Sequence, residues 1–304
     1  MAVSFRERPL LLSLQPKMSS GTLDQYRFHP RRYEQNKFVY PVVSRRSHGI
    51  SIGVNLNPDK ICNFDCIYCQ VDRRSEAETR FVEMDRLRAE IEEMLLQVST
   101  GEIYHDPRFS TLPPELRRLN DIAFSGDGEP TTFRNFDDIL QSVADIKDHL
   151  RLDDVKMVLI TNASMFHRER VKHGLEILDQ HQGEIWAKLD AGTADYYHEI
   201  DRTRIPFQRI LDNLLSAAQV RPIVIQSLFM KVNGVPPDEA EITAYIGRLR
   251  DILNAGGQLK LIQVYTVARP PAESFVSSLS REEVDAISGR VASETGLPVE
   301  PYYG

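Results

Sequence analysis

The sequence of 304 residues predicts an α/β fold in which parallel strands form a partial barrel of six strand–helix units. Two observations lead to this prediction. From Gly49 onward, short apolar runs alternate with longer segments of helical periodicity. Polar and glycine-rich segments follow the apolar runs, as expected where loops gather at the carboxyl ends of parallel strands. A doubly wound open sheet is the second architecture that this alternation allows.

Six apolar runs are expected to form the strands, and six segments with apolar residues at helical spacing are expected to form the helices. In the first helical segment, Leu87, Ile91 and Leu95 recur on one face. Strands are expected at 49–56, 121–126, 155–162, 184–190, 222–229 and 259–266. Helices are expected at 84–97, 136–150, 166–179, 207–218, 238–253 and 282–294.

Residues 1–48 show no clear periodicity and are expected to form an N-terminal extension to a barrel domain of residues 49–304, with a loop-rich insertion at about 101–119. The extension holds nine Lys or Arg against three Asp or Glu, a charge of +6, so the rest must carry −13 to give the total of −7. Six aromatic residues are interleaved with this basic charge, which is typical of nucleic-acid binding. The alternative is an extension that packs its aromatic side chains on the barrel and leaves its arginines in solvent.

The composition is that of an ordinary folded protein, with 41% hydrophobic and 27% charged residues. No apolar run approaches the roughly 20 residues that span a bilayer. The apolar patch near the start is too short for the core of a signal peptide. A cytoplasmic location without membrane association is therefore expected, and an odd number of clustered cysteines argues against a disulfide framework.

All three cysteines lie within eight residues, in the segment "CNFDCIYC" from Cys62 through Cys66 to Cys69. Three thiolates at this spacing can hold one metal centre. A structural zinc site needs four ligands, and no histidine follows within twenty residues of Cys69. A [4Fe–4S] cluster normally takes four thiolates, so three would leave one iron open to a small molecule. Inert buried thiols are the third interpretation, which the clustering disfavours.

The pattern C-x3-C-x-aromatic-C, with Tyr68 as the aromatic residue, resembles the signature of the radical S-adenosylmethionine (SAM) superfamily. The resemblance implies a partial (β/α)6 barrel, one [4Fe–4S] cluster held by Cys62, Cys66 and Cys69, and SAM bound at the open iron, with Tyr68 beside it. Reduction would cleave SAM to methionine and a 5′-deoxyadenosyl radical that abstracts hydrogen from the substrate. It also implies an external one-electron donor of the ferredoxin or flavodoxin type.

The segment "SGDGEPT" after the second expected strand resembles the Gly-Glu-Pro motif of this superfamily, which meets the amino group of SAM. Its candidate cofactor-binding residues are Gly126, Gly128, Glu129 and Pro130. Glycines let a backbone approach a ligand closely, and a carbonyl or the Glu129 carboxylate can accept a hydrogen bond from an ammonium group. The same glycines would also suit a tight loop.

The segment "LITNAS" closes the third expected strand and contributes Thr161 and Asn162 to the candidate cofactor site. The Asn162 amide offers a donor and an acceptor to the carboxylate and ribose of SAM. An Asx turn or a helix N-cap is an equally good and compatible interpretation.

Alternation along the strand at 184–190 predicts that Trp186, Lys188 and Asp190 point into the barrel. A charged side chain there is costly unless a partner or a ligand meets it. Asp190 is expected to hold the ribose hydroxyls, and Lys188 either contacts substrate or pairs with an acidic group such as Glu129. These two are the candidate catalytic residues.

Two later strand ends complete the candidate cofactor site. Gln226 lies near the end of the strand at 222–229. Val264 and Tyr265 lie where the superfamily commonly places the adenine of SAM, although a structural tyrosine is the alternative.

Residues 48–270 resemble one branch, the small bacterial and archaeal iron–sulfur oxidoreductases grouped with the wyosine-base (tRNA-modifying) synthases. Wyosine synthases bind a second cluster through further cysteines, and this chain has none outside 62–69. The wyosine reaction is therefore not expected, and the substrate, a small molecule or RNA, stays unassigned. The competing hypothesis is a non-catalytic zinc or iron–sulfur module whose N-terminal extension binds RNA.

Overall fold

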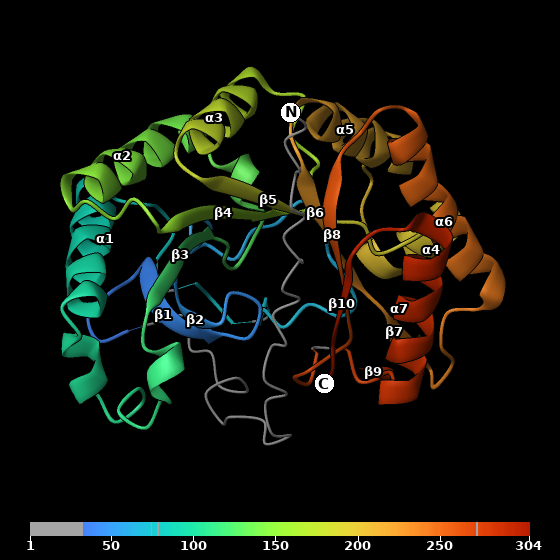
Figure 1. The fold of residues 1–304 in the computed structure, drawn as a ribbon, viewed down its shortest axis with the longest axis horizontal. Helices are drawn as coiled ribbons and strands as arrows, with labels where there is room; N and C mark the ends of the chain where they lie inside the picture. The colour runs from blue at the N-terminus through green and yellow to red at the C-terminus, as the bar shows by residue number, and fades with distance from the viewer. Residues whose placement is uncertain (1–32, 74, 78, 272) are drawn as a thin grey trace, which may run out of the picture.

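The computed structural model describes residues 33–73, 75–77, 79–271 and 273–304. Its centre is an eight-stranded sheet in the order β1-β2-β3-β4-β5-β6-β8-β10, which curls so that helices cover its outer face (Figure 1). Neighbouring strands are parallel except for β1 and β2, which are antiparallel. The predicted α/β partial barrel of parallel strands is confirmed. The first 32 residues of the expected N-terminal extension lie outside the described residues.

All six predicted strands and all six predicted helices are found, with boundaries shifted by three residues at most. The strands are β1 (Val39–Ser44), β2 (Gly49–Val54), β3 (Leu119–Phe124), β4 (Lys156–Thr161), β5 (Gly183–Lys188), β6 (Ile223–Leu228), β7 (Met230–Val232), β8 (Leu259–Tyr265), β9 (Val276–Ser278) and β10 (Val299–Tyr302). The helices are α1 (Met84–Ser99), α2 (Phe136–His149), α3 (Glu169–Gln180), α4 (Ala194–Asp201), α5 (Phe207–Val220), α6 (Glu239–Asn254) and α7 (Arg281–Thr295).

Both edge strands of the sheet, β1 and β10, are additions to the predicted set. Each contains a proline, Pro41 or Pro301, which an edge strand tolerates because one of its sides has no ladder to donate to. Strand β1 lies inside the segment expected as an extension, so that part of the segment is built into the sheet. Helix α1 anchors the residues just before β1. Its Glu90 side chain accepts hydrogen bonds from the backbone N–H groups of Lys37 (2.9 Å) and Phe38 (2.8 Å).

Three shorter features were also absent from the predicted set. Helix α4 begins at the N-cap Thr193, whose hydroxyl accepts from the Tyr196 N–H. Strands β7 and β9 form a separate antiparallel pair. The segment at 101–119 contains two single-turn 3-10 helices, at Glu102–His105 and Pro114–Leu116, and its last residue begins β3.

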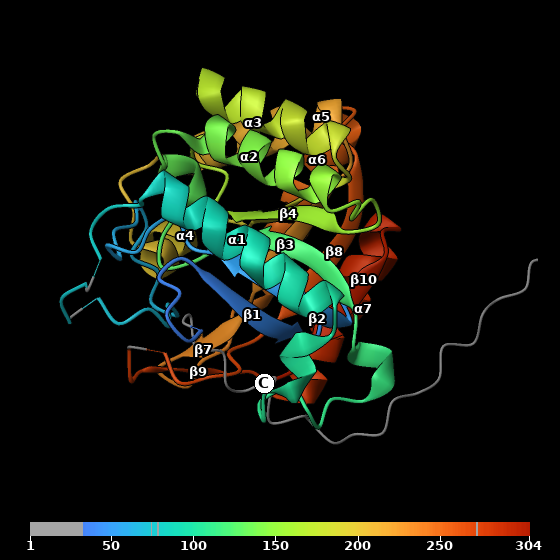
Figure 2. The same cartoon turned by 90° about the vertical axis from the view of Figure 1, so that its left-hand side faces the viewer.

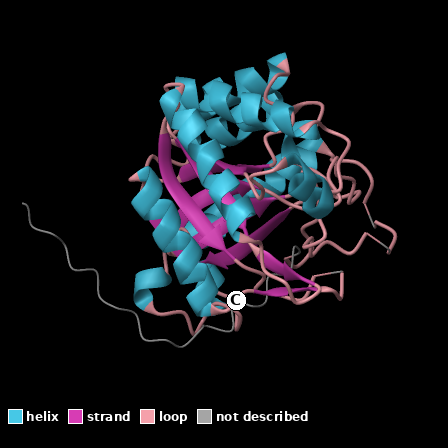
Figure 3. Ribbon diagram, turned by 90° about the vertical axis from the view of Figure 1, so that its right-hand side faces the viewer, coloured by secondary structure: helices cyan, strands magenta, loops and turns pink. Residues whose placement is uncertain are grey.

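Side chains alternate between the two faces of the sheet, which separates the core into two parts. Ile185 and Ala187 of β5 belong to the large core between sheet and helices, whereas Trp186 belongs to a small cluster on the inner face. Figure 3 shows the strands enclosed by helices, with many of the longer loops gathered on one side. The expected parity of β5 is confirmed for these residues.

A charged cluster ties together the amino-terminal ends of three strands. Glu184 of β5 accepts hydrogen bonds from the ammonium groups of Lys156 of β4 (2.7 Å) and Lys260 of β8 (2.6 Å). Its other oxygen accepts from the indole N–H of Trp186 at 3.0 Å. These bonds fix the end of the barrel opposite to the strand-end loops.

No helix among the described residues is long and apolar enough to cross a membrane.

Candidate active site

A cavity of about 410 Å³ lies on the inner face of the sheet. Two of the fifteen predicted site residues, Pro130 and Val264, are not part of its wall. Pro130 starts a short 3-10 turn, and Val264 is fully buried in the core that contains the helix-facing side chains. Because side chains alternate along β8, the Tyr265 side chain reaches the cavity and the Val264 side chain does not, so a contact of Val264 with the cofactor through its backbone stays a prediction. The predicted residues in the wall are Cys62, Cys66, Tyr68, Cys69, Gly126, Gly128, Glu129, Thr161, Asn162, Lys188, Asp190, Gln226 and Tyr265.

The cysteine loop follows β2 and is anchored by the apolar residues between its cysteines. Phe64 and Ile67 are buried, and the Phe64 ring meets the Tyr197 ring of α4 edge-on at 5.9 Å. Backbone N–H groups of the cysteine loop also donate to the last carbonyls of α4; the Ile67 N–H, for example, donates to Ile200 O at 2.8 Å. Sequence and packing together thus hold the loop down while its three cysteines line the cavity.

The Cys62, Cys66 and Cys69 side chains are partly exposed free thiols. Burial is the main reason that the pKa values of Cys62 and Cys66 are raised, so a positively charged metal centre would be needed to hold them as thiolates at neutral pH. Among the described residues, no three His, Cys, Asp or Glu side chains converge as a single metal ion requires. A cluster does not need such convergence, because each thiolate binds a different iron atom. The donor set therefore fits an iron–sulfur cluster.

The Arg73 guanidinium lies beside this loop. Its Nη2 atom is 3.6 Å from the Cys69 sulfur, and its other terminal nitrogen donates to the Lys60 carbonyl oxygen. A positive charge at this distance stabilises a thiolate. Arg73 was not among the predicted site residues, and nothing in its spacing from the cysteines pointed to it.

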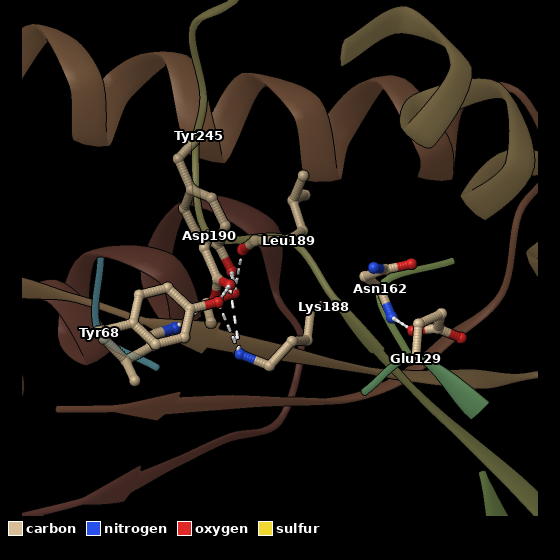
Figure 4. Close-up of polar contacts among 9 residues, drawn as sticks. Tyr68, Glu129, Asn162, Lys188, Leu189, Asp190 and Tyr245 are labelled. Atoms are coloured by element: carbon tan, nitrogen blue, oxygen red, sulfur yellow. Dashed lines mark hydrogen bonds and ion pairs between the residues drawn. The ribbon is translucent and has the colours of Figure 1, made fainter. Parts of the chain in front are cut away.

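Glu129 joins the ends of β3 and β4. Its Oε1 atom accepts from the Thr161 hydroxyl at 2.6 Å and from the Thr131 N–H at 3.1 Å. Its Oε2 atom accepts from the Asn162 N–H at 2.7 Å (Figure 4). Burial raises the pKa of this carboxyl, and these hydrogen bonds oppose the rise. The carboxylate is thus occupied by donors of the protein and positions the neighbouring loop.

Gly126 and Gly128 are required by close packing. A Cβ atom at Gly126 would lie 2.2 Å from Oδ1 of Asn55, and one at Gly128 would lie 2.2 Å from the Ile61 carbonyl oxygen. Any side chain at these positions would push the "SGDGEPT" loop away from the segment that leads into the cysteine loop. Asn55 also accepts from the Asp127 N–H at 3.1 Å, which fixes the same loop.

Asn162 was expected either to form a local turn or to bind SAM, and its position is compatible with both. Its Oδ1 atom accepts from the Ser164 N–H at 3.0 Å, as in an Asx turn, while its amide donates to Asn63 Oδ1 at 2.9 Å. The second bond connects the end of β4 to the cysteine loop. Asn162 also lines the cavity, so the structural and the binding interpretations are compatible.

Tyr68, Lys188 and Asp190 form a buried polar group at the end of β5 (Figure 4). The Lys188 ammonium lies 2.9 Å from the Tyr68 hydroxyl and 3.3 Å from Asp190 Oδ2, and the Tyr68 hydroxyl donates to the same carboxylate. The Leu228 N–H donates to Asp190 Oδ1 at 2.7 Å. The expected pairing of Lys188 occurs, but the suggested partner Glu129 is wrong, because Asp190 is two residues away on the same strand end.

The surroundings of Lys188 favour its charged form. Burial alone would lower its pKa, but the neighbouring Asp190 charge raises the pKa well above the ordinary value. The Lys188 Nζ atom also lies 4.5 Å from the centre of the Tyr68 ring.

Asp201 and Arg46 line the cavity and were not among the predicted site residues. Asp201 ends α4 and is buried, and burial followed by the Asp190 charge raises its pKa to about 7. Arg46 lies in the turn between β1 and β2. Both residues belong to elements that the sequence pattern did not reveal, so no periodicity could have placed them at the site.

No family model matches the chain. A protein named GTPase Obg from Brachyspira hyodysenteriae is 28% identical over 252 residues, which cover 81% of this chain and 32% of that protein. This chain thus spans about a third of that relative. A UPF0026 protein from Helicobacter pylori is 25% identical over 249 residues, 80% of this chain and 70% of that protein. The sequence has no Gly-Lys dipeptide and so lacks the phosphate-binding loop G-x-x-x-x-G-K-[ST].

Two solved structures share the fold. A radical SAM methyltransferase from Sphaerobacter thermophilus has a TM-score of 0.60 and 13% identity, covering 86% of this chain and 68% of that one. SuiB from Streptococcus suis, solved with S-adenosylmethionine bound, has a TM-score of 0.54 and 13% identity, covering 86% of this chain and 52% of that one. The resemblance to the radical SAM superfamily that the cysteine motif predicts is therefore confirmed at the level of the fold.

Proposed function

We propose that this chain, whose fold is that of radical SAM enzymes, binds one [4Fe–4S] cluster through Cys62, Cys66 and Cys69 and cleaves SAM reductively. The observation that carries the proposal is that the three cysteines line the same cavity as the loops at the ends of β3, β4 and β5. When bound, the reduced cluster would supply the electron that converts SAM to methionine and a 5′-deoxyadenosyl radical.

The residues of the chain supply the binding site. The backbone of the loop at Gly126 and Gly128 and the amide of Asn162 are the groups proposed to meet the amino and carboxylate ends of SAM. Glu129 positions both of these segments through its hydrogen bonds to Thr161 and Asn162. Glu129 is therefore proposed to shape the SAM site by positioning these two segments.

A second set of side chains positions Tyr68 and offers contacts to the nucleoside part of SAM. Asp190 and Lys188 hold the Tyr68 hydroxyl, and Tyr68 lies inside the cysteine loop, directly before Cys69. Gln226 donates to Gln263 Oε1 at 2.7 Å and lines the cavity, as does Tyr265. We propose Asp190, Gln226 and Tyr265 as the residues nearest to the nucleoside of SAM.

The proposed reaction needs an external one-electron donor, for which a ferredoxin or flavodoxin is the expected type. The substrate is proposed to be a small molecule or RNA. Activity, substrate and donor are proposals for the whole protein.

The proposal is tested by adding SAM to anaerobically reconstituted, reduced protein and recording the electron paramagnetic resonance spectrum. A SAM molecule that binds the open iron changes the spectrum, so a shifted signal is expected together with about four irons per chain. Zinc-loaded colourless protein, or a cluster signal that SAM does not change, would favour the non-catalytic module instead. A Cys69→Ala variant serves as the control and should lose most of its iron.

A further inference from the structure

Arg46 lies where the two edges of the open barrel approach each other. It belongs to the turn between β1 and β2, and its neighbour Arg45 donates to the Tyr303 carbonyl oxygen just after β10 at 2.9 Å. The Arg46 guanidinium carbon is 4.5 Å from the ring centre of Tyr265 and 5.4 Å from that of Tyr302. All of these rings and the guanidinium line the cavity that holds the candidate cofactor residues.

The charge of Arg46 has no acidic partner among the described residues. Its side chain makes contacts with the two tyrosine rings, whereas its Nε atom is buried and has no hydrogen-bond partner within the described part of the chain. An unpaired buried donor on a cation is costly, and proteins usually satisfy it with a partner or a ligand. The fork of Arg46 is therefore available to an acceptor in the cavity.

The other cation on the Tyr265 ring is already neutralised. Lys188 Nζ lies 5.6 Å from the centre of this ring, but it pairs with Asp190 at 3.3 Å. Asp121, a further carboxyl in the cavity wall, accepts from the Ser51 hydroxyl. Arg46 thus adds a positive charge beside Tyr265 that no ion pair among the described residues neutralises, although the Glu300 carboxylate accepts from the hydroxyl of the adjacent Tyr302.

We propose that Arg46 binds a carboxylate or phosphate group of a small-molecule substrate. The planar guanidinium matches the paired oxygens of either group, and stacking on Tyr265 and Tyr302 fixes its plane. The inference rests on the proposed function in that the bound acid would be the substrate of the same cavity. It names an acidic small molecule as the substrate class and Arg46 as a residue that determines specificity.

The test uses cluster-loaded full-length protein with SAM present. The midpoint of thermal unfolding is measured against increasing phosphate or acetate, with chloride at matched ionic strength as the reference. A ligand that binds the folded state raises the midpoint in proportion to its occupancy. We expect phosphate, acetate or both to exceed chloride, and Arg46→Gln to raise the apparent dissociation constant at least tenfold.

Two further variants separate the effect of the Arg46 guanidinium from the effects of charge and of folding. Arg46→Lys keeps the charge without the fork, so it is expected to retain part of the response and provides the comparison if Arg46→Gln folds poorly. Arg168→Gln removes the same charge from an exposed position and should respond as the wild type does. A response to phosphate alone indicates a phosphorylated substrate, and a response to acetate alone indicates a carboxylic acid.

The proposal is overturned if neither anion exceeds chloride, or if Arg46→Gln responds as the wild type does. SAM affinity is measured in parallel by equilibrium dialysis and is expected to change less than twofold in Arg46→Gln. A tenfold loss of SAM affinity in this variant would assign Arg46 to SAM rather than to substrate. Failure of the wild-type protein to bind SAM would count against the proposed function, whereas the anion response is read independently of it.

Discussion

Lys188 and Asp190 show how the inner face of this barrel accommodates charge. The Asp190 side chain is almost fully buried, and its two oxygens accept from Tyr68, Lys188 and the Leu228 backbone. A buried carboxylate is stable only when such donors surround it. Removing the Lys188 ammonium leaves Asp190 with a buried charge and one partner fewer.

We therefore expect Lys188→Met to lower the free energy of unfolding by about 2–4 kcal/mol, measured by urea denaturation at pH 7. The matched control is Lys172→Met, which breaks an exposed pair with Glu169 of the same helix at 2.7 Å. That change is expected to cost less than about 0.5 kcal/mol. Equal effects of the two substitutions would show that the buried Lys188–Asp190 pair does not stabilise the folded protein more than an exposed pair does.

At the residue scale, two patterns in the sequence pointed to residues of the cavity wall. The cysteine spacing and the alternation along β5 placed Cys62, Cys66, Cys69 and Lys188 in the cavity wall. The expected partner of Lys188, Glu129, was wrong, because Glu129 accepts hydrogen bonds from Thr131, Thr161 and Asn162, whereas Asp190 lies 3.3 Å from Lys188 Nζ. The partner of a buried charge depends on which donors already occupy each carboxylate, and residue types do not specify this.

The two edge strands and α4 are among the elements that the sequence failed to predict. Prolines at positions 41 and 301 interrupt the apolar pattern of β1 and β10, and only the position of these strands at the sheet edges makes the prolines tolerable. Helix α4 has eight residues and follows β5 closely. Its N-cap Thr193 was the available signal. Arg46 and Asp201 were missed because they are attached to these elements.

Glu184 connects the amino-terminal ends of β4, β5 and β8 through hydrogen bonds whose contribution to stability depends on pH. Burial alone would raise its pKa, but the hydrogen bonds from Lys156 and Lys260 lower the pKa from 4.5 to about 2. The folded-state pKa lies below the unfolded one, so the stabilisation is complete above pH 4.5 and is lost as the pH falls through 2.

We expect Glu184→Gln to lower the free energy of unfolding at pH 7 by about 1–2 kcal/mol, because solvent weakens a partly exposed cluster. The difference from the wild type should shrink by about half at pH 3. Urea denaturation at both pH values measures it, with the exposed Glu169→Gln as the control. A difference that stays constant between pH 7 and pH 3 would contradict the assigned ion pairs.

At the scale of the whole molecule, the sheet topology assembles one cavity from segments far apart in the chain. The cysteine loop, the ends of the parallel strands and the turn between β1 and β2 all contribute to its wall. Figure 2 shows the sheet between the helices from the side of α1. The sequence predicted this convergence for the strand ends because parallel strands point the same way. It did not predict the meeting of the two sheet edges, which depends on the curl of all eight strands.

The central claim is that the three cysteines and this cavity carry out reductive SAM cleavage. Its most direct measurement is the release of 5′-deoxyadenosine, followed by liquid chromatography, from anaerobically reconstituted protein given dithionite and SAM. We predict release at least a hundredfold above that of a variant with all three cysteines changed to alanine. Release from cluster-loaded wild-type protein that does not exceed that of the triple variant would contradict it.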